Sequence, residues 1–133
     1  MLSLCTSLYF YNNIAHEYAK VDGKIAAVGI TDYAQTALGD IVYVDLPEVG
    51  DEFEAGESFA SVESVKAASD VYCPVGGTIV EINETLTDQP DLVNESPEDD
   101  AWFVKIEMEE SADPTTLMTA EQYKAYVEEA DSS

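Results

Sequence analysis

Lys66 is the residue whose setting points most directly to chemistry. It lies in the segment ESVKAASD, residues 63–70, between two segments with the composition of short strands. A lysine at the tip of such a hairpin offers a primary amine that a modifying enzyme can reach and that a tethered cofactor can use for attachment. Lysines at turns more commonly serve solubility, so the position by itself leaves both interpretations open.

The segments on either side of Lys66 alternate polar and apolar side chains. Residues 57–63 and 70–75 both show this period of two, which is typical of half-buried strands. The chain must reverse between them at the surface, so the lysine side chain is expected to point into water. Four glycines separate further short strands, as a small flattened barrel of crossing hairpins requires. They are Gly50, Gly56, Gly76 and Gly77.

The strands that must position this hairpin are predicted from local signals. Asp22-Gly23 is the strongest two-residue hairpin signal in the chain and predicts paired strands on either side of it. Runs of β-branched and aromatic residues predict the others. The predicted strands, besides those flanking Lys66, are residues 17–22, 24–30, 41–46, 78–82 and 102–108.

One short helix is predicted before the third of these strands. It covers residues 32–38, with Thr31 or Asp32 as its cap and Gln35 placed to complete a capping box. Gly39 supplies the left-handed residue that ends it. The expected role of this helix is structural.

The C-terminal third combines an acidic loop with a helix. Residues 83–100 are acidic and contain two prolines, which predicts a long loop with one helical turn near residues 91–94. Residues 119–122 have capping-box chemistry and begin a helix that runs to Glu129 and is expected to pack on the barrel. Its apolar face consists of Tyr123, Tyr126 and Val127.

The composition excludes several classes of function. The chain has 28 acidic residues against five lysines and no arginine, a formal net charge of −23, which excludes nucleic acid and anionic membrane surfaces as partners. The acidity fits solubility in a salty cytoplasm and equally fits steering towards basic docking surfaces on several enzymes. The 133 residues are expected to form a single domain with a core at about 9–110 and a helical segment at about 113–130.

Metal sites and structural disulfides are not expected. Cys5 and Cys73 are far apart without metal-type spacing, and His16 is the single histidine. Cys73 is predicted to be a small buried residue. No segment has the length of a membrane span and no catalytic constellation is present, so the expected setting is the cytoplasm, or the mitochondrial matrix in a eukaryote.

Several ordered motifs lie between His16 and about Ile106. They are HE at 16–17, VGITDYAQ at 28–35, LGDIV at 38–42, LPEVG at 46–50, ESVKAASD at 63–70 and PDLVN at 90–94. Through these motifs the chain resembles the H-protein family of the glycine cleavage system. The resemblance implies a mainly β, flattened lipoyl/biotinyl-type barrel-sandwich (hammerhead) with short helices and a C-terminal helix. The chain departs from the family pattern at Tyr18, Ala15 and Cys73, and it lacks a glycine before Trp102.

The resemblance implies a non-catalytic carrier whose cofactor is lipoic acid in amide linkage to Lys66. The arm would shuttle the aminomethyl intermediate of glycine decarboxylation between separate enzymes. Those partners are a glycine decarboxylase with pyridoxal phosphate (P-protein), an aminomethyltransferase using tetrahydrofolate (T-protein) and a dihydrolipoyl dehydrogenase with FAD (L-protein). A lipoate ligase or a lipoyl/octanoyl transferase would attach the cofactor.

The resemblance also assigns roles to residues around the lysine. Glu63 and Gly77 match residues that present the lysine for lipoylation. Glu17 and Asp70 match contacts of the aminomethyl-loaded arm, and Ala15 stands at the site of a third contact. In a chain with 28 acidic residues, each of these carboxylates has an alternative interpretation as an ordinary surface charge.

Other carriers and a non-carrier remain as alternatives. A biotin carrier typically has methionines beside its lysine, where this chain has Val65 and Ala67, and a dehydrogenase-complex lipoyl domain usually has Asp before the lysine. An H-like protein that only donates lipoate to other complexes would use the same lysine and fold. An unmodified acidic interaction module would leave Lys66 without an acyl group.

Overall fold

The computed structural model describes residues 8–12, 16–98, 100–109 and 117–131. Its strands are β1 Leu8–Asn12, β2 Glu17–Asp22, β3 Ile25–Ile30, β4 Ile41–Asp45, β5 Glu52–Phe53, β6 Ser58–Ser64, β7 Ala68–Tyr72, β8 Gly77–Ile82, β9 Val104–Met108 and β10 Met118–Thr119. Its helices are α1 Asp32–Leu38, α2 Thr85–Asp88, α3 Leu92–Glu95 and α4 Ala120–Asp131. Cys5 and Ala15 lie outside the described residues.

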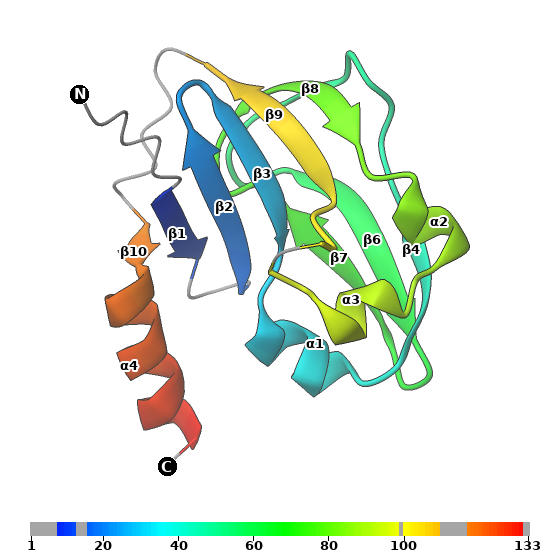
Figure 1. Cartoon of the computed structure of the whole chain (residues 1–133), viewed down its shortest axis with the longest axis vertical. Helices are drawn as coiled ribbons and strands as arrows, with labels where there is room; N and C mark the ends of the chain where they lie inside the picture. The colour runs from blue at the N-terminus through cyan, green and yellow to red at the C-terminus, as the bar shows by residue number, and fades with distance from the viewer. Residues whose placement is uncertain (1–7, 13–15, 99, 110–116, 132–133) are drawn as a thin grey trace, which may run out of the picture.

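The described strands form two antiparallel sheets (Figure 1). The larger sheet has the order β10-β1-β2-β3-β9-β8-β5, and the smaller one has the order β4-β6-β7. The core lies between them, because buried side chains of β3 and β9 in one sheet join those of β6 and β7 in the other. Val28, Ile106, Val62 and Val71 represent these four strands in the core. The predicted mainly β class with short helices and a C-terminal helix is confirmed.

The β2–β3 hairpin follows from its turn. Asp22 pairs with Ile25, which leaves Gly23 and Lys24 as a two-residue turn in which Gly23 has a φ of +65°. This type of turn needs a residue with a left-handed φ, which glycine adopts without strain because it has no Cβ. The predicted hairpin is confirmed, except that Lys24 belongs to the turn and not to the strand.

Helix α1 covers the predicted residues and is capped by Thr31, whose Oγ1 accepts a hydrogen bond from the N–H of Ala34 at 3.2 Å. The predicted capping box is wrong in one half, because the side chain of Gln35 donates to Asp32 Oδ1 and Thr36 Oγ1. Gly39 ends the helix with a φ of +85° and donates its N–H to the carbonyl of Gln35.

The segment between β8 and β9 is more regular than its composition predicts. It contains the expected turn near residues 91–94 as α3, and a second short helix, α2, that was not expected. Each helix buries one apolar side chain completely, Leu86 from α2 and Val93 from α3. Burial of these two side chains orders a segment that prolines and carboxylates make look like a plain loop.

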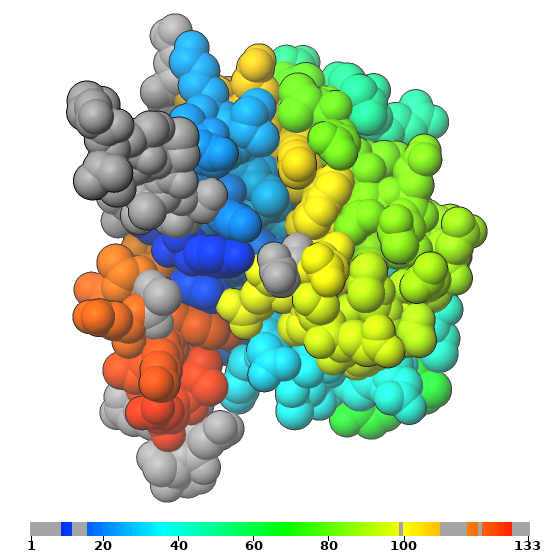
Figure 2. All heavy atoms as spheres, in the orientation of Figure 1, coloured from blue at the N-terminus to red at the C-terminus, as the bar shows by residue number. Residues whose placement is uncertain are grey.

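Helix α4 packs against β1 at the edge of the larger sheet (Figure 2). Thr119 and Gln122 form the predicted capping box in both directions, at 3.3 and 3.0 Å. Tyr123 is buried and stacks on Tyr11, with ring centroids 4.7 Å apart. The hydroxyl of Tyr123 also lies 2.6 Å from His16 Nδ1 and 2.9 Å from Thr31 Oγ1. These contacts confirm that the helix packs on the sheet. Among the described helices, none has the length and apolar character to cross a membrane.

Candidate functional site

Lys66 lies in the tight turn that joins β6 to β7. The two strands pair as far as Glu63 and Ala68, and the N–H of Ser64 then donates to the carbonyl of Ala67 at 2.7 Å. Val65 and Lys66 therefore form a two-residue turn, and neither has a positive φ. Such a turn lacks the twist that hairpins favour, so it needs support from elsewhere.

The hydroxyl of Ser64 gives part of that support. Its Oγ accepts hydrogen bonds from the N–H groups of Lys66, at 3.2 Å, and Ala67, at 3.1 Å. The same hydroxyl can donate to the carbonyl of Ala67 at 3.2 Å. The serine hydroxyl thus accepts from two backbone N–H groups of the turn, those of Lys66 and Ala67, that form no hydrogen bond in the β6–β7 ladder.

The turn is also anchored to the segment between α1 and β4, which lies beside it in Figure 1. Val65 donates its N–H to the carbonyl of Asp40 at 3.0 Å. The aliphatic part of Lys66 passes over Gly39, where an added Cβ would lie 3.4 Å from Lys66 Cε. The absence of a side chain at position 39 therefore leaves room for the lysine stem.

Asn94 holds this anchoring segment in place. Its Oδ1 accepts from the N–H of Ile41, and its Nδ2 donates to the carbonyl of Gly39 and to Oε1 of Gln35, all at 2.8 Å. One side-chain amide thus ties α3 to the end of α1 and the start of β4. Any shift of this segment would move the carbonyl of Asp40 and with it the lysine turn.

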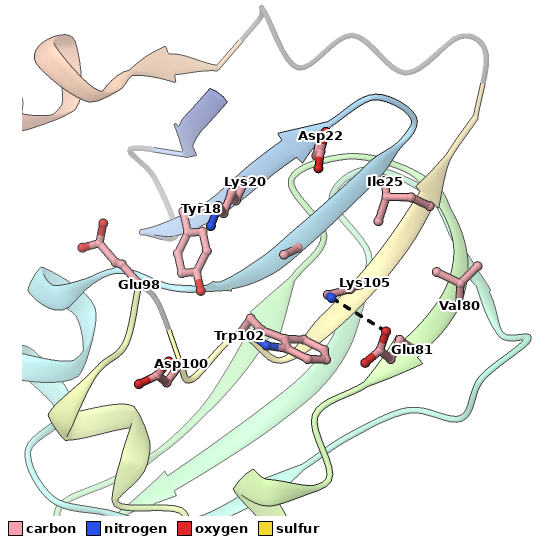
Figure 3. A pocket seen from close by; sticks show the side chains of 11 residues that line it. Tyr18, Lys20, Asp22, Ile25, Val80, Glu81, Glu98, Asp100, Trp102 and Lys105 are labelled. Atoms are coloured by element: carbon pink, nitrogen blue, oxygen red, sulfur yellow. Dashed lines mark ion pairs between the residues drawn. The ribbon is translucent and has the colours of Figure 1, made fainter. Parts of the chain in front are cut away.

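The ammonium of Lys66 has no hydrogen bond or ion pair to any residue that the structure describes. Lys105 instead pairs with Glu81 at 3.7 Å and lies over the ring of Trp102 at 4.8 Å (Figure 3). Lys24 is exposed in a hairpin turn, as Lys66 is. Exposure in a turn therefore does not distinguish Lys66 from Lys24. What distinguishes Lys66 is that its turn is held by the hydroxyl of Ser64 and by the carbonyl of Asp40.

The hollow drawn in Figure 3, of about 710 Å³, lies away from this lysine. Its lining residues come from β2, β3, β8, β9 and the segment before β9. Tyr18 forms part of it and covers Gly29, where an added Cβ would lie 2.8 Å from the tyrosine hydroxyl. Tyrosine thus fills this position against a glycine of the neighbouring strand.

Glu17 is buried, with 1% of its surface exposed, which rules out the alternative interpretation of this carboxylate as an ordinary surface charge. Its Oε2 accepts the N–H of Tyr72, at the free edge of β7, at 3.0 Å. Its Oε1 is buried without a hydrogen-bond partner among the described residues. Loss of solvation raises the pKa of Glu17 from 4.5 to about 7, against the lowering effect of the bond from Tyr72.

Asp70 lies two residues before Tyr72 on the same strand and is exposed. Two residues of strand span about 7 Å, so the structure brings Glu17 and Asp70 to one stretch of β7. Cys73 follows in the chain and is buried as predicted, and loss of solvation, with Glu17 and Glu57 nearby, raises the pKa of its thiol to about 12.

The two residues expected to guide lipoylation lie in different places. Glu63 is exposed on β6, directly before the turn, and pairs with Ala68. Gly77 is buried in β8, where an added Cβ would clash with the carbonyl oxygen of Glu107. Its φ is not positive, so the close approach of β9 explains the glycine.

Sequence reasoning gave no role to Ser64, Gly39, Asp40 or Asn94 in holding the lysine turn. The PDLVN motif did contain the asparagine, but its partners lie 53 to 59 residues away in the chain. The role of the Asp40 carbonyl cannot be predicted from the sequence, because every residue has a backbone carbonyl.

The comparisons with known proteins decide the family. The model of the glycine cleavage H-protein family matches residues 9–130. The chain belongs to this family. It is 54% identical over 116 residues to the glycine cleavage system H protein of Halothermothrix orenii, which covers 87% of this chain and 91% of that protein. It is 54% identical over 114 residues to the H protein of Geobacillus thermodenitrificans, covering 86% and 90%.

A crystal structure of the H protein from Mycobacterium marinum matches with a TM-score of 0.81 at 34% identity, covering 92% of this chain and 98% of that one. The chain is thus a lipoyl carrier of the glycine cleavage system and not an enzyme, since family members carry lipoyl-lysine without catalysing a reaction themselves. The lysine of the supported turn fits such a group, because its amine has no hydrogen bond or ion pair to a described residue and its stem has room over Gly39.

The buried carboxyl of Glu17 predicts a pH dependence of stability. Because its pKa in the folded protein lies above 4.5, the folded state binds the proton more tightly, and stability falls as the pH rises from about 4.5 to about 7. The effect of this one group is at most about 3 kcal/mol. Urea unfolding of the wild type and Glu17→Gln across this range isolates it from the other carboxylates. The stability of the variant relative to the wild type should grow with pH; a constant difference would contradict the raised pKa.

Gly77→Ala separates a structural role from a recognition role. The added Cβ meets backbone of β9, which cannot move without disturbing the β8–β9 ladder, so we expect a loss of stability of about 2 kcal/mol or more. Thermal unfolding and the lipoylation rate should be measured on the same preparation, with Gly56→Ala as a glycine control whose added Cβ has open space but a positive φ. An unchanged melting temperature with slow lipoylation would refute the structural explanation.

Proposed function

We propose that Lys66 is the lipoylated residue and that the chain carries its cargo on the resulting arm between the other components of the glycine cleavage system. The observation that carries this proposal is the lysine turn, in which Val65 is anchored to Asp40 and the ammonium of Lys66 has no partner within the described part of the chain. A rigid base with a free amine is what a tethered group needs, because the base fixes the origin of the arm and leaves its end mobile.

The bound lipoyl group would supply a disulfide that accepts the cargo and is later restored by oxidation. Lysine and lipoyl together place roughly ten single bonds of about 1.5 Å between backbone and sulfur, which gives a reach of over 10 Å. That reach allows the sulfur atoms to enter active sites of separate proteins while the barrel stays outside.

The proposed partners are the glycine decarboxylase, the aminomethyltransferase and the dihydrolipoyl dehydrogenase of the system, with a lipoate ligase or a lipoyl/octanoyl transferase for attachment. Membership of the glycine cleavage system supports the first three. The net charge of −23 supports docking to basic surfaces on them. We propose the cytoplasm as the compartment, which fits the free, buried thiol of Cys73, and a single carrier domain as the working unit.

Glu17 and Asp70 are proposed to hold the loaded end of the arm at the edge of β7. The cargo carries an amine that is protonated at neutral pH, and Oε1 of Glu17 is a buried acceptor without a partner among the described residues. An ammonium close to Glu17 would favour its ionised form and so bring its pKa down from about 7. A charge-assisted hydrogen bond would form in a site that excludes most water. Asp70, which is exposed, would supply a weaker, solvent-screened attraction.

Lys66→Arg tests the attachment site, with Lys24→Arg as a matched control because Lys24 also lies in a two-residue hairpin turn. Arginine keeps the charge but offers no amine that these enzymes acylate. We expect no lipoylation of Lys66→Arg and wild-type lipoylation of Lys24→Arg, measured by intact mass after incubation with lipoate ligase, lipoate and ATP. Lipoylation of Lys66→Arg would refute the assignment.

Glu17→Gln and Asp70→Asn test the shelter of the loaded arm. Both variants should be lipoylated normally, because neither carboxylate forms an ion pair with unmodified Lys66 and the ammonium of the cargo is present only after loading. Once loaded, Glu17→Gln should release ammonia and formaldehyde roughly tenfold faster than the wild type, the equivalent of one lost charge-assisted bond. The change for Asp70→Asn should be smaller. Equal release rates for all three proteins would show that these carboxylates do not hold the arm.

A further inference from the structure

Three large apolar side chains are exposed beside the lysine turn. Val42, Tyr43 and Val65 expose 52%, 48% and 68% of their surface. They lie close together, because Ile41 pairs with Ser64 and Tyr43 pairs with Glu63 across the β4–β6 ladder. We call Val42, Tyr43 and Val65 the tip patch.

The exposure of the tip patch has a local cause in β4. The register of β4 against β6 shifts between Ile41 and Tyr43, so one extra residue, Val42, is inserted there. This irregularity allows two consecutive side chains, Val42 and Tyr43, to be exposed where a regular strand would bury one of them. β4 is an edge strand, and the same irregularity disfavours the addition of a further strand from another chain. A partner at this edge would therefore contact side chains.

The tip patch has an acidic rim. Glu63 pairs with Tyr43 on one side and with Ala68 on the other, and Asp40 and Asp45 flank the patch along the chain. All three carboxylates are exposed. An apolar centre with an acidic rim is complementary to a protein surface with an apolar contact surrounded by lysines or arginines.

The position of the patch indicates which of the partner enzymes would contact it. The amine of Lys66 is only about 6 Å from its own backbone, so the enzyme that forms the amide must place its active site against the turn itself. A standard interface covers about 800 Å² on each partner, and Val65 of the patch is the direct neighbour of Lys66 in the chain, so an enzyme that contacts the turn also covers the patch. Enzymes that act on the far end of the arm, over 10 Å from the same backbone, need not touch it.

We propose that the tip patch is the docking surface for the enzyme that acylates Lys66, with Tyr43 as its main contact. The proposal rests on the proposed function, since it requires that Lys66 be acylated. In this proposal Glu63 lies between its two cross-strand neighbours, Tyr43 and Ala68. Tyr43 supplies the apolar contact with the enzyme, and the carboxylate of Glu63 supplies the charged one.

The test compares lipoylation rates of exposed variants with matched controls. The probe is a lipoate ligase with lipoate and ATP. In the step that is followed, the lysine nitrogen bonds to the carbonyl carbon of lipoyl-AMP, the C–O bond to AMP breaks, and the ammonium loses two protons. Tyr43→Ala is paired with Tyr126→Ala on α4, which is 38% exposed, and Val65→Ser is paired with Val80→Ser on β8, which is 41% exposed. Melting temperatures exclude loss of fold as the cause.

Tyr43→Ala should lower kcat/KM for lipoylation about tenfold, chiefly through KM, and Val65→Ser about threefold, while both controls stay within about twofold of the wild type. Tyr43→Phe should retain the wild-type rate. Fully lipoylated Tyr43→Ala should accept cargo from the glycine decarboxylase at the wild-type rate.

Two results would overturn the inference. One is lipoylation of Tyr43→Ala at the rate of Tyr126→Ala. The other is an equal slowing of lipoylation and of loading by the decarboxylase, which would make the patch a general docking surface. Both results leave wild-type Lys66 lipoylated, whereas failure of the proposed function would appear as a wild-type protein without the added mass on that residue.

Discussion

The hydrogen bond from Val65 N–H to the carbonyl of Asp40 is the interaction on which the presentation of Lys66 depends. The turn projects beyond the core, and residues 65–70 are all exposed, so apolar packing does not fix its position. The position is set instead by this bond and by Ser64 within the turn. Asp40 is in turn held by the amide of Asn94, which bonds its neighbours on both sides. A short polar chain from α3 thus determines where the arm begins.

The buried carboxyl of Glu17 is a second constraint, and it lowers the stability of the fold. Burial of the Glu17 carboxyl raises its pKa to about 7, so near neutral pH part of the population holds a buried negative charge, one oxygen of which has no hydrogen-bond partner among the residues described. A neutral or apolar residue would make the fold more stable there. The proposed contact with a cationic cargo gives a reason for the cost, because the same carboxylate regains a partner only when the arm is loaded. Function and stability would then place opposite demands on one residue of β2.

Elements with local signals were predicted well from the sequence. Asp22-Gly23, the Thr31 cap with Gly39 at the end of α1, and the Thr119 capping box depend on contacts within four residues, and all three are present. Apart from the Gln35 half of the capping box on α1, the predictions that fell short involve residues distant in the chain. Asn94, the burial of Glu17 against Tyr72, and the need for Gly77 beside Glu107 depend on pairings made by the folded sheets. The position of Lys66 in a surface turn was predicted because the alternating strands on either side of it and the ESVKAASD motif both pointed to the same hairpin.

The central claim is that Lys66 carries lipoic acid in the living cell. Peptide mapping by mass spectrometry of the protein purified from its native source tests it most directly, because no partner or assay has to be reconstituted. The account predicts a lipoyl group on the peptide that contains Lys66 and unmodified Lys20, Lys24, Lys105 and Lys124. An unmodified or biotinylated Lys66, or a lipoyl group on another lysine, would contradict it.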